Sequence, residues 1–347
     1  MATRIVIRTP NHLGDCVMAL PMVNEVREAY PDSHITLLVP SNLGDLWAGN
    51  PAIDEILAVP AEHIHGLLSV VKIKELLTNQ CYDIGYILPP SFGAAASFKL
   101  AGIRERIGYV ADGRRLLLTR PLPLPTPLNA HHRCELYFNL LRRGAEVDLP
   151  LSEPRLYMSD SDRARATQLL ADFDLSDLDQ YVVVAFRAVA QSRRWGIDNY
   201  GQLAKWIVGN HRLSVLLVGS SDDRTEGERL VDLAGGTSVV NLAGKTSLRE
   251  LAAILAGAQL FVGNDSGPAH LAAAVGTPIV VLSGADDPGS TSPISKSMRL
   301  LRLDSLDCLA CVKNKCPLKG DEQMQCMAGI SVEMVTREVE RVLAAEL

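Results

Sequence analysis

The chain has 347 residues, 47% of them hydrophobic, and a formal net charge of −6 at neutral pH. This length predicts about two domains, each with its own apolar core. The acidic balance argues against nucleic-acid binding, and no apolar run reaches the roughly 18–20 residues of a membrane-spanning helix. The first residues lead directly into a strand pattern, so we expect no N-terminal signal and a protein that is soluble or attached to a membrane face.

Strand and helix patterns then alternate along the chain. Strands are predicted at residues 4–8, 34–40, 82–89 and 105–110, and helices at 15–30, 67–77 and 135–144. Residues 119–132 and 148–162 are rich in proline, which disfavours both helices and strand ladders. A second series follows, with strands predicted at 181–188, 213–220, 239–244, 260–265 and 278–285 and helices at 199–210, 223–236, 247–258 and 267–276.

This alternation predicts an α/β protein with two Rossmann-like, doubly wound domains. We place the N-terminal domain at residues 1–160 and the C-terminal domain at 175–330, joined near residues 150–175. An amphipathic helix over residues 331–347 ends the chain. Ligands of such sheets bind at the carboxyl ends of the strands, which predicts a site in the cleft between the domains.

Polar residues follow the predicted strands at several points. In the stretch Asn264-Asp265-Ser266-Gly267-Pro268, a strand ends and a helix begins, with His270 one turn further on. The unpaired N–H groups and positive dipole end of that helix suit a diphosphate. Helix capping alone explains the same residues equally well.

Three other strand-end loops carry candidate groups. Gly14-Asp15 places a carboxylate after the first strand, either as a general base for a sugar hydroxyl or as a helix cap. Arg193 and Arg194 follow the first strand of the second domain and are either phosphate contacts or solvated charges. Ser220 and nearby acids suit a ribose diol or an ordinary exposed helix start.

Seven cysteines are present, and four of them are close together. Cys16, Cys81 and Cys134 are scattered, as expected of core thiols in a reducing compartment. Cys308, Cys311, Cys316 and Cys326 have the spacing C-x2-C-x4-C-x9-C, which is compatible with a structural zinc site. An iron–sulfur cluster, free thiols and disulfides are the alternatives.

Five motifs occur in order along nearly the whole chain: "NHLGDCVMALP", "RRW", "NLAGKTSLREL", "GNDSGPAHLAAAVGTPIVVLSG" and "DDPGSTSP". In these motifs the chain resembles the glycosyltransferase family 9 heptosyltransferases, in particular the lipopolysaccharide heptosyltransferase II branch. The resemblance implies a GT-B fold and inverting transfer of L-glycero-D-manno-heptose from ADP-heptose to the inner core of lipopolysaccharide. It also implies that transfer needs no divalent metal and no other cofactor.

The resemblance implies roles for individual residues. Asp15 corresponds to the catalytic base. The implied donor contacts are Arg193, Glu226, Thr246, Asp265, Ser266, Gly267 and His270. Ser220 joins these donor candidates because of its place after a predicted strand. One departure is the stretch 187–190, which reads Arg-Ala-Val-Ala where many relatives have Pro-Gly-Ala or hydroxyl residues.

The implied acceptor is the anionic lipid A–Kdo–heptose at the membrane face, so the expected location is cytoplasmic and peripheral on the inner membrane. His12, Arg114 and Arg115 are the candidate acceptor contacts, within a basic set that also holds Lys99, Arg104, Arg106, Arg120, Arg142 and Arg143. A solvated basic surface is the alternative for this set. For the whole chain, the alternatives are another nucleotide sugar or acceptor on the same fold, or a sugar-nucleotide-binding protein without catalysis.

Overall fold

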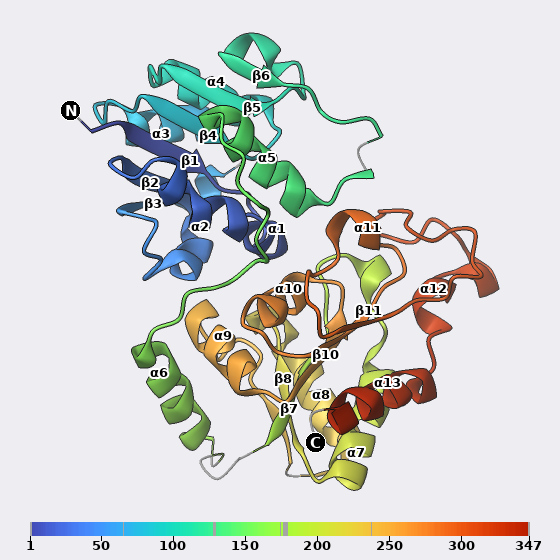
Figure 1. Cartoon of the computed structure of the whole chain (residues 1–347). Helices are drawn as coiled ribbons and strands as arrows, with labels where there is room; N and C mark the ends of the chain where they lie inside the picture. Colours follow the sequence, from blue (N-terminus) through green and yellow to red (C-terminus); the bar gives the residue numbers. More distant parts are fainter. Residues whose placement is uncertain are drawn as a thin grey trace. The chain divides into compact units, whose positions relative to one another are not determined.

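The computed structural model describes residues 2–64, 66–127, 130–173, 175, 180–236 and 238–345. The chain divides into two compact units, Met1–Tyr157 (unit 1) and Met158–Leu347 (unit 2) (Figure 1). The division falls just before helix α6 (Asp160–Ala171), which packs against α9 (Leu248–Gly257) of unit 2.

Unit 1 contains a parallel six-stranded sheet in the order β3-β2-β1-β4-β5-β6. Its strands are β1 (Arg4–Arg8), β2 (His34–Pro40), β3 (Glu55–Val59), β4 (Ile84–Ile87), β5 (Glu105–Tyr109) and β6 (Arg120–Leu122). Ile5, Val6 and Ile7 of β1 are fully buried. A near-continuous apolar strand of this kind is typical of a parallel sheet covered on both faces.

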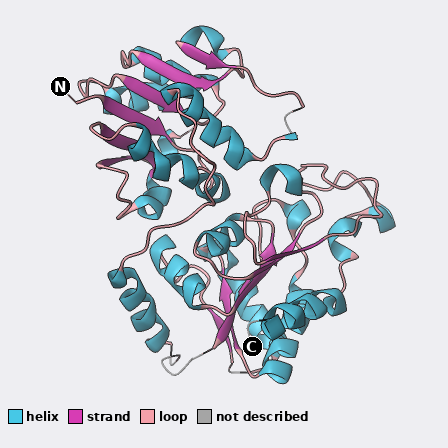
Figure 2. Ribbon diagram, in the orientation of Figure 1, coloured by secondary structure: helices cyan, strands magenta, loops and turns pink. Residues whose placement is uncertain are grey.

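Helices cover both faces of this sheet (Figure 2). They are α1 (Leu13–Met18), α2 (Leu20–Ala29), α3 (Leu67–Leu77), α4 (Phe92–Leu100) and α5 (Arg133–Ala145). Helix α5 packs against α1 and α2, whereas α3 packs against α4. The single helix that we predicted over residues 15–30 is divided at Ala19 into α1 and α2.

Unit 2 repeats the topology of unit 1, with the parallel strand order β12-β11-β10-β7-β8-β9. Its strands are β7 (Tyr181–Ala185), β8 (Ser214–Val218), β9 (Val239–Asn241), β10 (Leu260–Asn264), β11 (Ile279–Leu282) and β12 (Met298–Leu301). The remaining helices are α7 (Ile197–His211), α8 (Arg224–Ala234), α10 (Gly267–Ala274), α11 (Pro288–Thr291), α12 (Gln325–Ala328) and α13 (Val332–Ala345).

The helices of unit 2 form two groups: α7 contacts α8 and α13, whereas α9 contacts α6 and α10. Both units thus have the doubly wound Rossmann order, which confirms the predicted fold class. The order reverses between β1 and β4 in unit 1 and between β7 and β10 in unit 2. Ligands of this fold bind outside the carboxyl ends of the strands at such a reversal.

The sequence patterns missed three strands, β3, β6 and β12. Each lies at a sheet edge, and β6 is a three-residue strand that contains Pro121. Edge positions tolerate proline because one side of the strand needs no ladder bond. In the described part of the chain, no helix is both long and apolar enough to cross a membrane.

Candidate functional site

In unit 1, the loop after β1 brings Asp15 to the point where the strand order reverses. Asp15 lies in the first turn of α1, and the N-cap residue of this helix is His12. Asp15 is therefore not the helix cap that we considered. Its Oδ1 accepts hydrogen bonds from Arg133 Nη1 at 3.1 Å and from Tyr137 Oη at 3.2 Å. Both donors come from α5, which packs against α1.

The charge of Asp15 affects the pKa values of both donors. Burial lowers the pKa of Arg133, but the Asp15 charge, aided by Tyr137, outweighs burial and raises that pKa overall. Burial, and then the charge of Asp15, raises the pKa of Tyr137 well above its usual value, so this phenol stays a neutral donor. The Asp15 side chain is 19% exposed, so it remains within reach of a ligand.

The three candidate acceptor contacts differ in their exposure to solvent. His12 and Arg115 are exposed. Arg114 is fully buried, and its guanidinium donates to the main-chain oxygens of Tyr109, Pro89, Ser91 and Ile87. Burial lowers the pKa of Arg114 to about 10. Arg114 is therefore a core residue of unit 1, and our expectation that it faces an acceptor is corrected.

In unit 2, the loop after β10 leads into α10 with its N-terminal N–H groups uncapped by a side chain. Ser266 is the N-cap residue, but its hydroxyl donates back to the Asn264 oxygen at 3.1 Å. Gly267 and Pro268 form the first turn, and proline there has no N–H to satisfy. A helix start explains Pro268, but no side chain caps this helix. Its first N–H groups therefore suit a bound anion.

Behind this helix start lies a buried group of charged residues. Asp265 is 1% exposed and lies 3.6 Å from His270 Nε2, an ion pair when that histidine is protonated. Arg193, from the loop after β7, donates to the main-chain oxygen of Asp265 at 3.4 Å. These residues meet because β7 and β10 are neighbours in the sheet.

The Arg193 guanidinium also pairs with Asp286, whose side chain is fully buried after β11. Burial, and then repulsion from Asp265, raises the pKa of Asp286 to about 7, although Arg193 opposes the shift. Arg193 thus lies among acidic groups, and a bound diphosphate would compete with Asp286 for its charge.

Of the other donor candidates, Ser220 and Thr246 lie on the loops after β8 and β9, and Glu226 lies in the first turn of α8. Glu226 pairs with Arg187 Nη1 at 2.6 Å, and Arg187 Nε contacts Asp223 Oδ1 at 3.3 Å. The Ser220 hydroxyl donates to Asp223 Oδ2 at 2.7 Å within a capping box. Thr246 is half-buried and directly precedes Ser247, the N-cap of α9. Arg187, which lies in the stretch that departs from the family pattern, therefore contacts both Asp223 and Glu226, the acid assigned to the ribose.

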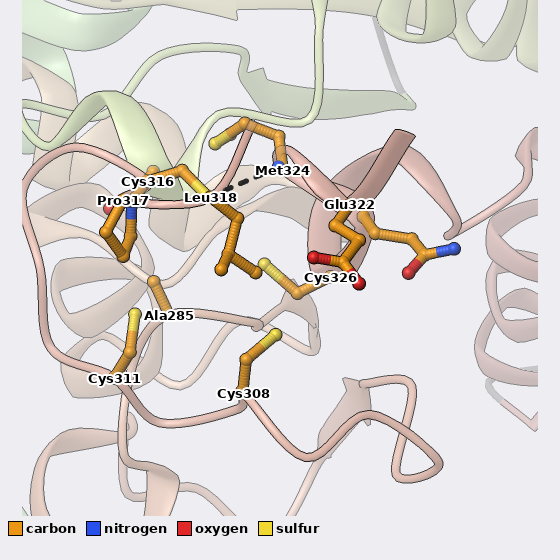
Figure 3. Close-up of a pocket in the computed structure, with 11 residues that line it drawn as sticks. Ala285, Cys308, Cys311, Cys316, Pro317, Leu318, Glu322, Met324 and Cys326 are labelled. Carbon is orange, nitrogen blue, oxygen red and sulfur yellow. Dashed lines mark hydrogen bonds between the residues drawn. The ribbon is translucent and has the colours of Figure 1, made fainter. Parts of the chain in front are cut away.

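The four C-terminal cysteines line one pocket, together with Ser192, Ala285 and Leu318 (Figure 3). All four are free thiols. Among the described residues, no three His, Cys, Asp or Glu side chains are gathered closely enough to hold a metal ion. The structure brings the predicted cysteines together but does not form a coordination sphere.

Sequence reasoning assigned no role to Arg133, Tyr137 or Asp286, and it noted Arg187 only as part of a departure from the family pattern. Asp286 follows β11 by four residues, so the rule that located Asp265 also applied to it. Arg187 likewise follows β7. Arg133 and Tyr137 are one helical turn apart, but no sequence signal shows that their helix packs beside Asp15.

Comparisons with known proteins show the family of the chain. The family "Glycosyltransferase family 9 (heptosyltransferase)" matches residues 70–321. Lipopolysaccharide heptosyltransferase 2 of Salmonella typhimurium is 28% identical over 323 residues, covering 86% of this chain and 88% of that protein.

Solved structures show the same similarity. The ADP-heptose lipopolysaccharide heptosyltransferase II structure from E. coli matches with a TM-score of 0.82 and 26% identity, covering 99% of both chains. A family 9 glycosyltransferase from Veillonella parvula matches with a TM-score of 0.84 and 24% identity, covering 99% of this chain and 97% of that one. The chain therefore belongs to glycosyltransferase family 9, the heptosyltransferases, and has their GT-B fold.

Proposed function

We propose that the protein transfers L-glycero-D-manno-heptose from ADP-heptose to the inner core of lipopolysaccharide. The observation that carries this proposal is the Asp15–Arg133–Tyr137 group after β1 in a chain of this family. The names of its relatives support the donor and the acceptor class, because these proteins are named as lipopolysaccharide heptosyltransferases. In unit 2, Arg193 and the uncapped start of α10 support a donor that contains a diphosphate.

The proposed reaction is a single displacement with inversion at the anomeric carbon. The acceptor hydroxyl oxygen attacks that carbon, the hydroxyl proton passes to Asp15, and the bond to the ADP oxygen breaks. Arg133 and Tyr137 both contact Oδ1 of Asp15, so we assign the proton to Oδ2. The two α5 side chains thus act as positioning residues for the base.

The leaving diphosphate needs positive charge on unit 2. Arg193 and the N-terminal N–H groups of α10 supply it, with His270 as an additional donor. Glu226 and Ser220 are assigned to the ribose and Thr246 to the adenine. Asp265, Ser266 and Gly267 complete the loop that holds the donor.

The proposed acceptor is a heptosylated Kdo–lipid A, which is anionic and anchored in a membrane. His12 and Arg115 remain candidate contacts because both are exposed on unit 1. A lipid acceptor places the working protein at the cytoplasmic face of the inner membrane, as a peripheral protein.

The decisive experiment measures ADP release from ADP-L-glycero-D-manno-heptose with this acceptor. We expect acceptor-dependent release by the wild type and a loss of about a hundredfold or more in Asp15→Ala, because general-base catalysis contributes at least that much. Donor affinity, measured by calorimetry, should be little changed. The exposed Asp32, in the loop before β2, provides the control variant Asp32→Ala.

Other outcomes would redirect the assignment. Equal losses of turnover and donor affinity in Asp15→Ala would make Asp15 a structural residue. Donor binding by the wild type without release would point to another acceptor, or to a binding protein without catalysis. Failure to bind ADP-heptose would favour another nucleotide sugar, because Arg187 changes the group around Glu226 and Asp223.

A further inference from the structure

The segment between β12 and α13 has the chemistry of a metal-binding loop. Cys308, Cys311, Cys316 and Cys326 line a single pocket. In Figure 3 the thiols of Cys308, Cys311 and Cys326 point into this pocket around Leu318. Four thiols that line one pocket provide the donor set of structural zinc and iron sites.

The backbone around the cysteines is held in an uncommon conformation. Ala310 and Val312, on either side of Cys311, both have φ of 53°. A β-branched residue such as Val312 rarely adopts positive φ. Two hydrogen bonds fix this turn, from Ala310 N to Gly284 O at 3.0 Å and from Val312 N to Ala285 O at 2.8 Å.

Further along the loop, the sulfur of Cys316 accepts a hydrogen bond from the main chain. Met324, with φ of 60°, donates its N–H to Cys316 Sγ at 3.4 Å. Lys313, Lys315 and Lys319 are interleaved with the cysteines and exposed, so they offset the negative charge of a thiolate group.

We propose that Cys308, Cys311, Cys316 and Cys326 bind one tetrahedral, thiolate-preferring divalent ion, Zn²⁺ or Fe²⁺, that fastens this loop to the donor side of unit 2. Binding deprotonates four thiols and releases four protons, so that the ion and four thiolates carry a net charge of −2. The four side chains already share the pocket, so we expect metal binding to draw their sulfurs together into one coordination sphere.

The loop is joined to both segments that carry the Arg193–Asp286 pair. Ser192, next to Arg193, donates its N–H to Asn314 O at 3.1 Å and its hydroxyl to Lys313 O. Gly284, two residues before Asp286, approaches Cys326 so closely that a Cβ at position 284 would lie 2.9 Å from its sulfur. The metal therefore stabilises the placement of Arg193 and Asp286, an effect on donor binding that rests on the proposed function.

The first test measures metal in the full chain, purified anaerobically without chelators. We expect about one zinc or iron per chain by elemental analysis, the identity of the ion deciding between the two. Cys311→Ser should lose the metal. Cys81→Ser, which removes an exposed cysteine of unit 1, should retain it.

A second measurement avoids dependence on the folding of the variant. Wild-type protein is stripped with a chelator under reducing conditions and titrated with Zn²⁺ or Co²⁺ alone. Uptake of one ion, with the thiolate-to-cobalt absorption of a tetrahedral site, supports the proposal. Absence of native metal together with no uptake by the reduced protein overturns it, as does a pair of disulfides in the anaerobic protein.

The link to the donor site is tested separately with ADP. We expect the stripped protein to bind ADP about tenfold more weakly than the metal-loaded form, because small displacements of a binding group are costly. Unchanged ADP affinity would overturn the link and leave the metal site standing. If the metal-loaded protein bound no ADP, the proposed function would fail while the metal analysis remained valid.

Discussion

At the scale of single residues, two carboxylates at strand ends have opposite surroundings. Asp15 receives hydrogen bonds from Arg133 and Tyr137, which fix the orientation of the proposed base. Asp286 is buried beside Asp265, and its pKa rises to about 7 for that reason. Asp286 therefore changes its charge near neutral pH, next to the Arg193 that we assign to the diphosphate.

This contrast predicts a pH dependence of donor binding. As pH rises from 6 to 8, Asp286 loses its proton, and the new negative charge opposes the diphosphate and competes for Arg193. The affinity for ADP-heptose should therefore fall, by about fivefold for an opposing interaction of about 1 kcal/mol. ADP-heptose is the suitable probe because its diphosphate has no terminal phosphate that titrates in this range.

The variant Asp286→Asn should bind ADP-heptose with nearly the same affinity at both pH values. His270 and Asp265 also face this group, so Asp287→Asn, one position further from the pair, serves as the control and should keep the wild-type dependence. A pH dependence that persists in Asp286→Asn would assign it to His270 instead. Calorimetry over this pH range measures all three proteins.

Residue positions could be predicted from sequence only where the strand-end rule applied. That rule located Asp15, Arg193 and Asp265, because a strand end in a doubly wound sheet is visible as the last apolar residue of a run. It could not show that Arg114 lies in the core, since its four main-chain acceptors come from residues 87–109. Burial of a charged side chain depends on tertiary contacts that the pattern of residues does not contain.

At the scale of elements, α6 shows how a helix beside a proline-rich segment is held to unit 2. Its capping box joins Ser159 to Asp162, and Asp162 also forms a buried ion pair with Arg249 of α9, with Arg249 Nε donating at 3.1 Å. The Arg249 contact lowers the pKa of Asp162 far below its usual value, opposed by burial and assisted by Ser159. Both contacts depend on one carboxylate.

We therefore expect Asp162→Asn to destabilise the protein by about 3 kcal/mol at neutral pH, because it removes the Asp162 charge from its buried ion pair with Arg249. Since the folded-state pKa is lowered, the contribution of Asp162 is fully present above its unfolded value near 4 and is lost as pH falls towards the folded value. The deficit of the variant should shrink in acid. Urea unfolding at pH 7 and pH 3 measures it, with Asp160→Asn as the exposed control on the same helix turn. Equal stability of the two variants would contradict this role.

The central strands of both sheets were predicted from the sequence, whereas the three strands that it missed all lie at sheet edges. Strands β1, β7 and β10 are buried apolar runs, and such runs are clear in a sequence. Strands β6 and β12 at the sheet edges are three and four residues long and have mixed polarity. Edge strands are specified by pairing with a neighbour, so their own residues carry a weak pattern.

At the scale of the whole molecule, the structure reduces the number of basic residues that remain candidates for contact with the acceptor. Arg114 and Arg106 donate to main-chain oxygens, and Arg120 pairs with Glu146. Arg142 donates to Leu149 O and lies over the ring of Phe138. Several of these arginines thus hold unit 1 together, and the exposed cations of the set are Lys99, Arg104, Arg115 and Arg143.

This difference predicts unequal effects of neighbouring charges in a chain whose net charge is −6. Arg115→Glu should leave the fold intact and raise the KM for the anionic lipid acceptor severalfold at low salt, with kcat and donor affinity little changed. The effect should fade as salt approaches 1 M, where charges more than about 3 Å apart are screened. Lys205→Glu on α7 makes the same change in net charge on unit 2 and should leave the acceptor KM unaltered. Equal effects of the two variants would assign the result to overall charge. General repulsion between an acidic protein and an acidic lipid acts on both variants, whereas a contact with the acceptor is lost only in Arg115→Glu.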